Sequence, residues 1–145
     1  MEIKRLELDD IGLMEDVMKD DHMIFSEEYL RNFINDDHNH GFIVKGDESI
    51  VGFAYAYGLL RPDGKRMLYL HSIGLLPEHQ GKGLGTKLLG YIIEYARENG
   101  FSECFVITDK GNERACHVYE KLGGKNDYED EIVYVYNFEK QEELS

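Results

Sequence analysis

The sequence has no tryptophan, two prolines, two cysteines and no long hydrophobic run. Cys104 and Cys116 lack the spacing of a metal site or a redox pair, so we expect two reduced thiols in a cytoplasmic protein. The first ten residues contain no apolar signal region, and no run approaches the roughly 18 apolar residues of a transmembrane helix. We therefore expect no membrane association. His38 and His40 have no further ligands at suitable spacing, so we expect no metal site.

Positive charge is also scarce. There are 16 Lys and Arg residues against 29 Asp and Glu residues, which gives a formal net charge of −13. Such a surface would repel nucleic acid, because binding to nucleic acid relies on neutralised phosphates. It could instead attract a cationic substrate from solution.

The length and composition indicate a globular protein. A chain of 145 residues, 42% of them hydrophobic, corresponds to one domain with a substantial core. We expect this domain to cover residues 1–138 and to be followed by a charged tail, 139–145.

Hydrophobic periodicity predicts alternating strands and helices. We expect a first edge strand over 2–7, then a helix capped by Asp9 or Asp10 and a second helix capped by Ser26. The remaining predicted elements are strands over 42–45, 50–60, 67–76, 101–108 and 132–138, and helices over 85–99 and 113–122. The strand over 101–108 should lie parallel to the strand over 67–76, because a helix connects them.

A glycine-rich loop joins the strand over 67–76 to the helix that follows it. Gly81, Gly83 and Gly85 permit positive φ angles and leave backbone N–H groups uncovered where a helix begins. Helix N-termini bind anions, so the loop predicts a phosphate site. It fits neither the Walker motif, since Thr86 and Lys87 stand in the wrong order, nor the dinucleotide fingerprint, which needs glycine at position 86.

Two motifs resemble those of a known family. The loop Gln80-Gly81-Lys82-Gly83-Leu84-Gly85 is similar to the Gln/Arg-x-x-Gly-x-Gly/Ala loop of the GCN5-related N-acetyltransferases (GNAT), which holds the pyrophosphate of acetyl-coenzyme A. A second landmark of the family is matched by Asn112, Ala115, Tyr119, Lys121, Leu122 and Gly123. Within this family, the segments YLHSIGLLPEH (69–79), FVITDKGN (105–112) and EDEIVYVYNF (129–138) resemble the aminoglycoside 3-N-acetyltransferase type.

The resemblance implies a GNAT fold, which is a mixed α/β sandwich. Its six- or seven-stranded, mostly antiparallel sheet would be flanked by about four helices. The sheet would be splayed between the central strand over 67–76 and the strand over 101–108, and the coenzyme would lie in the splay. A bulge is expected near Ile73 and Gly74, since glycine inside a strand is typical of bulges.

The family pattern also implies which residues bind acetyl-coenzyme A. They are Ile73, Leu75, Gln80, Gly81, Lys82, Gly83, Leu84, Gly85, Thr86, Asn112 and Tyr119. Because the coenzyme is an anion and the chain is acidic, local positive charge is needed at the site. The candidates for it are Lys82, Lys87, Arg114 and Lys121.

Three residues have implied catalytic roles. Tyr119 corresponds to the family's usual general acid, and the Ile73 N–H would bind the thioester oxygen. His71 is the nearest titratable group that could act as a base, although a lone histidine on a strand is more often structural. Tyr69 through a water, an acceptor-side carboxylate such as Glu28, or the absence of any dedicated base are the alternatives.

The implied function is transfer of an acetyl group from acetyl-coenzyme A to a primary amine of a small, cationic acceptor. Ser72 stands where the aminoglycoside enzymes tend to have a carboxylate, which weakens the case for an aminoglycoside substrate. Acidic and aromatic residues around the first two helices could bind an amine: Asp20, Asp21, Glu27, Glu28 and Tyr29. The alternatives are a protein or peptide N-acetyltransferase, a non-catalytic acetyl-coenzyme A sensor and a partner-binding protein. A homodimer is a further option, because the last strand often contributes to dimers in this family.

Overall fold

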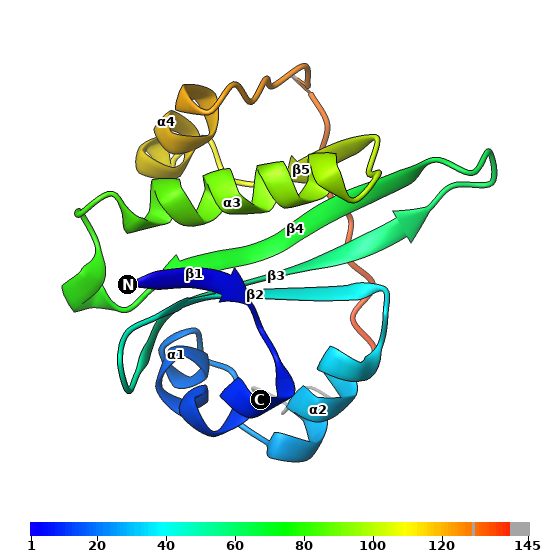
Figure 1. Cartoon of the computed structure of the whole chain (residues 1–145). Helices are drawn as coiled ribbons and strands as arrows, with labels where there is room; N and C mark the ends of the chain where they lie inside the picture. Colours follow the sequence, from blue (N-terminus) through cyan, green and yellow to red (C-terminus); the bar gives the residue numbers. More distant parts are fainter. Residues whose placement is uncertain (129, 140–145) are drawn as a thin grey trace, which may run out of the picture.

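A five-stranded sheet with the order β1-β2-β3-β4-β5 forms the centre of the structure, a computed structural model in which residues 1–128 and 130–139 are described (Figure 1). The strands are β1 (Glu2–Arg5), β2 (Asn39–Lys45), β3 (Ile50–Leu60), β4 (Arg66–Leu75) and β5 (Glu103–Val106). The first four strands pair antiparallel, and β5 pairs parallel to β4. The mixed, mostly antiparallel sheet is therefore confirmed.

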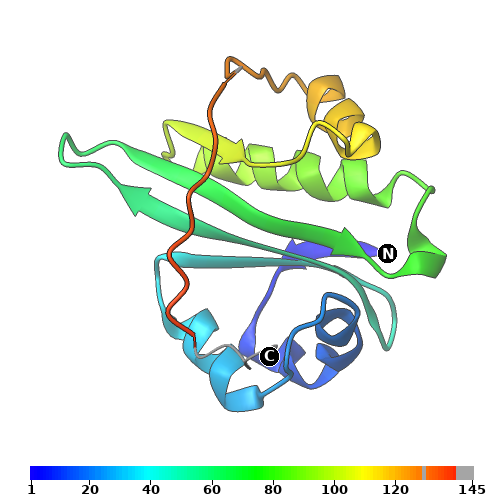
Figure 2. The same ribbon diagram turned by 180° about the vertical axis from the view of Figure 1, so that it is seen from behind.

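Helices cover both faces of this sheet (Figures 1 and 2). Helices α1 (Glu15–Asp20) and α2 (Glu27–Asn35) lie on one face, and α3 (Leu84–Glu98) and α4 (Glu113–Lys121) lie on the other. Two short 3-10 helices, η1 (Leu8–Leu13) and η2 (Pro77–His79), complete the described elements. No helix among the described residues is both long and apolar enough to cross a bilayer.

The N-terminal helical region differs from the prediction in one respect. The Ser26 hydroxyl caps α2 as expected, by accepting a hydrogen bond from the Tyr29 N–H at 3.3 Å. The first helix, however, is divided into η1 and α1, and Glu7 rather than Asp9 or Asp10 is the N-cap of η1. Asp10 is buried and forms salt bridges with Lys4 at 3.1 Å and Lys45 at 2.9 Å.

Two apolar clusters hold the helices to the sheet. Leu68 and Leu70 of β4 pack with Leu88 and Ile92 of α3 on one face. On the other face, the cluster includes Phe53 of β3 and residues of η1, α1 and α2. The sheet thus has α3 on one side and the α1–α2 region on the other.

The predicted splay lies at the end of β4. Met67–Leu70 pairs with Glu103–Val106, and β4 then continues to Leu75 with only β3 as its partner. The second half of β4 therefore has an edge on which β5 forms no ladder.

The bulge predicted in the central strand is present, but it lies two residues before Ile73. The register between β3 and β4 shifts where Tyr55 pairs with Ser72 and Ala56 pairs with Leu70, so His71 is the extra residue. Pairing is regular at Ile73 and Gly74, where we expected the bulge. A bulge places two consecutive side chains on one side of a sheet. His71 and Ser72 both face the α1–α2 side, as their contacts with Tyr55 and with Asp21 of the α1–α2 loop show.

The predicted strand over 132–138 is wrong. The described structure assigns no strand there, and the exposed fractions of its large apolar side chains run from 71% to 94%. A strand needs a hydrogen-bonded partner as well as an alternating sequence. The edge strand β5, which would be that partner, is only four residues long. The described sheet consequently has five strands rather than six or seven. Residues 140–145 of the predicted charged tail lie outside the described residues.

His40 gives the fold a pH-dependent stability. The Nδ1 atom of this buried ring forms a hydrogen bond of 2.8 Å with the Tyr95 hydroxyl. The same hydroxyl accepts a hydrogen bond of 2.6 Å from the Arg5 guanidinium. Burial, with Arg5 and Arg66 nearby, lowers the pKa of His40 from 6.5 to about 4. Arg5 donates to the Tyr95 oxygen, and the hydroxyl proton of Tyr95 is available to the Nδ1 atom of a neutral imidazole.

We expect the free energy of unfolding to fall as pH falls through the window from 6.5 to about 4. Between these two pH values His40 is protonated in the unfolded chain but neutral in the folded chain. Protonation therefore lowers the free energy of unfolding by up to about 3 kcal/mol. Urea denaturation at several pH values measures the slope. His40→Gln should flatten it, and an unchanged slope in this variant would contradict the assignment.

Candidate active site

The loop before α3 presents an uncapped helix N-terminus. Gly81 and Gly83 have φ angles of +77° and +82°, in the left-handed region that favours glycine. Gly83 is the N-cap of α3 and contributes no side chain to its first turn, which begins at Leu84, close to the predicted Gly85. The first N–H groups of a helix have no partner within it, so those of residues 84–86 are available to an anion.

One of the predicted basic residues lies beside this loop. A Cβ atom built on Gly81 would be 3.9 Å from a guanidinium nitrogen of Arg114, which belongs to the first turn of α4. Lys82 is exposed within the loop itself. The two cations supply local positive charge next to the N-terminus of α3, against the negative charge of the chain as a whole.

Gln80 fixes the loop to the end of β4. Its side-chain N–H donates to the Leu75 carbonyl oxygen at 3.0 Å. The Gln80 amide thus joins the loop to the strand, and its predicted coenzyme-binding role stays a prediction. The Leu75 N–H is not used by this contact.

The free edge of β4 presents two backbone N–H groups to the splay. The Leu76 N–H donates to the Val51 carbonyl oxygen at 2.8 Å, so it points toward β3. Backbone groups alternate in direction along a strand, and the register is regular from Ser72 to Leu75. The N–H groups of Ile73 and Leu75 consequently point away from β3, toward the side where β5 has diverged.

Two predicted residues of α4 lie on the same face of the sheet as α3. The Asn112 side-chain oxygen accepts from the Ala115 N–H at 3.1 Å and caps α4, which leaves its N–H groups free to donate. Tyr119 is half-buried and packs against the cluster that contains Leu68 and Leu88. Burial, with a smaller contribution from Cys116, raises the pKa of Tyr119, so its phenol stays protonated at neutral pH and can donate.

The opposite side of the splay carries aromatic rings. His71 stacks on Tyr55 with ring centroids 5.2 Å apart, and its Nδ1 atom lies 3.1 Å from the Tyr55 hydroxyl. Tyr69 contacts His71 and stacks on Phe105 of β5, with centroids 4.9 Å apart. His71 is exposed, so its second ring nitrogen is accessible from this side.

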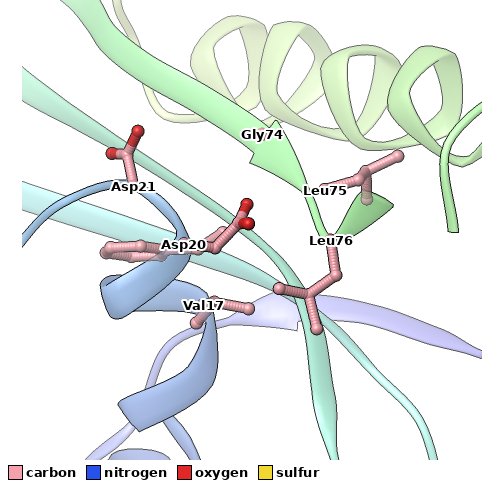
Figure 3. Close-up of a pocket in the computed structure, with 7 residues that line it drawn as sticks. Val17, Asp20, Asp21, Gly74, Leu75 and Leu76 are labelled. Atoms are coloured by element: carbon pink, nitrogen blue, oxygen red, sulfur yellow. The ribbon is translucent and has the colours of Figure 1, made fainter. Parts of the chain in front are cut away.

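A small pocket lies between the end of α1 and the end of β4 and is lined in part by Phe53, which packs next to Tyr55 (Figure 3). Its volume is about 30 Å³, and Asp20, Asp21, Gly74 and Leu75 are among the residues that line it. The Ser72 hydroxyl donates to an Asp21 carboxylate oxygen at 3.3 Å. Sequence reasoning had placed Asp21 only within a group of acidic residues and did not connect it to Ser72.

Together these parts form one site with two sides. The uncapped N-terminus of α3, two outward N–H groups and a protonated phenol lie toward α3 and α4. An imidazole, a carboxylate and aromatic rings lie toward α1 and α2. Among the described residues, no three His, Cys, Asp or Glu side chains gather as metal ligands.

A profile of the Acetyltransferase (GNAT) family matches residues 11–124, which include both sides of this site. The chain belongs to this family. Acetyl-coenzyme A is the acetyl donor of GNAT acetyltransferases. The uncapped N-terminus of α3, the neighbouring Arg114 and the free edge of β4 fit such a ligand.

Curated relatives of this GNAT chain include enzymes that act on small amines. It is 39% identical over 75 residues to the L-amino acid N-acyltransferase MnaT of Escherichia coli, covering 51% of this chain and 43% of that protein. It is 29% identical over 90 residues to the mouse thialysine N-epsilon-acetyltransferase, covering 62% of this chain and 53% of the relative. The matches thus span about half the length of these relatives.

Solved structures of GNAT proteins share the fold. An aminoglycoside acetyltransferase from an uncultured soil metagenomic sample, in complex with sisomicin, superposes with a TM-score of 0.79 at 25% identity and covers 96% of each chain. Aminoglycoside N-acetyltransferase AAC(6')-Iy in complex with CoA has a TM-score of 0.77 at 20% identity, covering 94% of this chain and 99% of that one. The second likeness concerns the fold alone.

Proposed function

We propose that the chain is an acetyl-coenzyme A-dependent N-acetyltransferase that acetylates a primary amine of a small, cationic acceptor. The observation that carries this proposal is the uncapped α3 N-terminus beside the free edge of β4. The small-amine enzymes among its relatives support the same class of acceptor. We further propose that residues 1–138 act as one N-acetyltransferase domain and that the protein works in the cytoplasm.

The proposed binding roles use the backbone and side-chain donors that face the splay. The N–H groups of residues 81–86 and the Thr86 hydroxyl would bind the diphosphate, with Lys82 and Arg114 offsetting its charge. The Leu75 N–H and the Asn112 side chain would bind the pantetheine arm. When bound, the coenzyme supplies an acetyl group activated as a thioester.

Three residues would share the catalytic roles: one would stabilise the thioester oxygen, one would accept a proton and one would donate a proton. The Ile73 N–H would donate to the carbonyl oxygen and stabilise the charge that develops there. The acceptor would react as the neutral amine, and His71 would accept the proton that its nitrogen loses as the C–N bond forms and the C–S bond breaks. Tyr119 would donate its phenol proton to the departing sulfur. His71 would then release its proton to solvent and the Tyr119 phenolate would regain one, which restores both side chains.

The test is release of free thiol from acetyl-coenzyme A across a panel of amines. We expect release with at least one small cationic amine, in an amount equal to the acetylated product. Release only with peptides would indicate a protein acetyltransferase. Binding of acetyl-coenzyme A without release for any amine would contradict the proposed transfer and indicate a sensor.

A further inference from the structure

The Ser72–Asp21 contact joins two elements across the acceptor side of the site. Ser72 lies on the half of β4 that β5 does not pair, and Asp21 is the C-cap of α1. Their hydrogen bond of 3.3 Å connects residues 51 positions apart in the sequence. Next to it, the pocket continues to Gly74 and Leu75, whose strand offers the Ile73 and Leu75 N–H groups to the splay.

Asp21 carries a negative charge that the described protein does not neutralise. Within residues 1–128 and 130–139, no Lys, Arg or His nitrogen forms a salt bridge with it at 4.0 Å or less. Asp10, by contrast, is paired with Lys4 and Lys45. Figure 3 shows the Asp21 carboxylate on the α1 side of the pocket, directed toward β4.

The surroundings of Asp21 suit an organic cation. Ser72, which donates to Asp21, follows His71 in β4 and pairs with Tyr55 of β3, so the Asp21 carboxylate lies close to the Tyr55–His71 stack. Half-buried aromatic rings attract cations through their faces. A ligand placed between Asp21 and these rings would meet both a carboxylate and an aromatic wall.

We propose that Asp21, aligned by the Ser72 hydroxyl, binds the acceptor in its ammonium form and makes the site selective for cationic amines. The bound ammonium then releases one proton to solvent, and the neutral amine that results is the attacking group. Asp21 thus contacts the substrate, and Ser72 is a positioning residue that acts through it. This inference rests on the proposed N-acetyltransferase function.

The experiment compares benzylamine, which is charged at neutral pH, with aniline, which has a similar ring but is neutral. Asp21→Asn keeps the shape and the hydrogen bond from Ser72 but removes the charge. We expect its kcat/KM for benzylamine to fall about tenfold, mainly through KM, with little change for aniline. Asp20→Asn removes the same charge from the same pocket without touching the Ser72 contact and should have a clearly smaller effect.

Ser72 is tested by rescue. Ser72→Ala should lower the preference for benzylamine over aniline, and Ser72→Thr, which keeps a hydroxyl, should restore most of it. A purely structural role would change the use of both amines equally. Thermal unfolding of each variant separates a folding defect from a change in selectivity.

Binding provides a second readout that does not depend on acetyl transfer. NMR titration of the wild-type chain with benzylamine should shift the His71 and Tyr55 ring signals, and Asp21→Asn should weaken this binding about tenfold. If the wild-type chain releases no thiol with any amine but still binds benzylamine through Asp21, the transferase proposal fails and this inference stands. Equal benzylamine binding by both proteins, or a larger loss in Asp20→Asn, would overturn it.

Discussion

Tyr119→Phe should lower the turnover number by about a hundredfold while the affinity for acetyl-coenzyme A stays nearly unchanged. The substitution removes only the hydroxyl. Loss of a general acid typically lowers the rate by roughly 10²- to 10⁴-fold. The raised pKa of Tyr119 means that the phenol is present in the donating form at neutral pH. Steady-state kinetics together with calorimetric titration of the coenzyme measure the two effects separately.

Tyr91→Phe is the matched control for this variant. Tyr91 is on α3, packs its ring on Phe42 and is not among the residues of the proposed site. It should keep wild-type turnover. An unchanged turnover number in Tyr119→Phe would remove Tyr119 from the mechanism, whatever the stability of the variant.

Gly83→Ala should weaken binding of acetyl-coenzyme A by about tenfold or more. The φ angle of Gly83 is +82°, and a side chain in this region costs roughly 1–2 kcal/mol. Nothing lies within 4 Å of the added Cβ, so the loss would come from backbone strain and from obstruction of the ligand rather than from a clash inside the protein. Relaxation of this angle would also turn the N–H groups of the first turn of α3.

Gly123→Ala controls for strain alone. Gly123 has a φ angle of +90° after the end of α4, and its added Cβ would also meet nothing within 4 Å. Both variants should lose similar stability in thermal unfolding, but only Gly83→Ala should lose affinity for the coenzyme. Equal affinities in the two variants would show that the loop does not bind the diphosphate.

Much of the fold could be predicted from sequence because its signals are local. The boundaries of β3, the cap of α2 and the start of α3 depend on turn residues, on Ser26 and on Gly83. The final strand could not be predicted reliably, because alternation at residues 132–138 says nothing about a partner. The position of the bulge depends on how β3 and β4 pair, and a glycine at position 74 was a misleading signal.

The two sides of the site also differ in how well the sequence predicts them. The coenzyme side follows from motifs contiguous in sequence, such as Gln80–Thr86, and the geometry of β4 and α4 is consistent with them. The acceptor side depends on contacts between distant segments, and no local pattern connects Asp21 with Ser72. A charged residue in a loop after a helix is too common a feature to indicate a contact across the sheet.

The most direct test of the central claim is a crystal structure of the chain soaked with acetyl-coenzyme A. We predict density for the diphosphate at the N–H groups of residues 81–86, with the thioester oxygen at the Ile73 N–H and the sulfur near the Tyr119 hydroxyl. A cleft that remains empty, or a coenzyme bound elsewhere on the chain, would contradict the account.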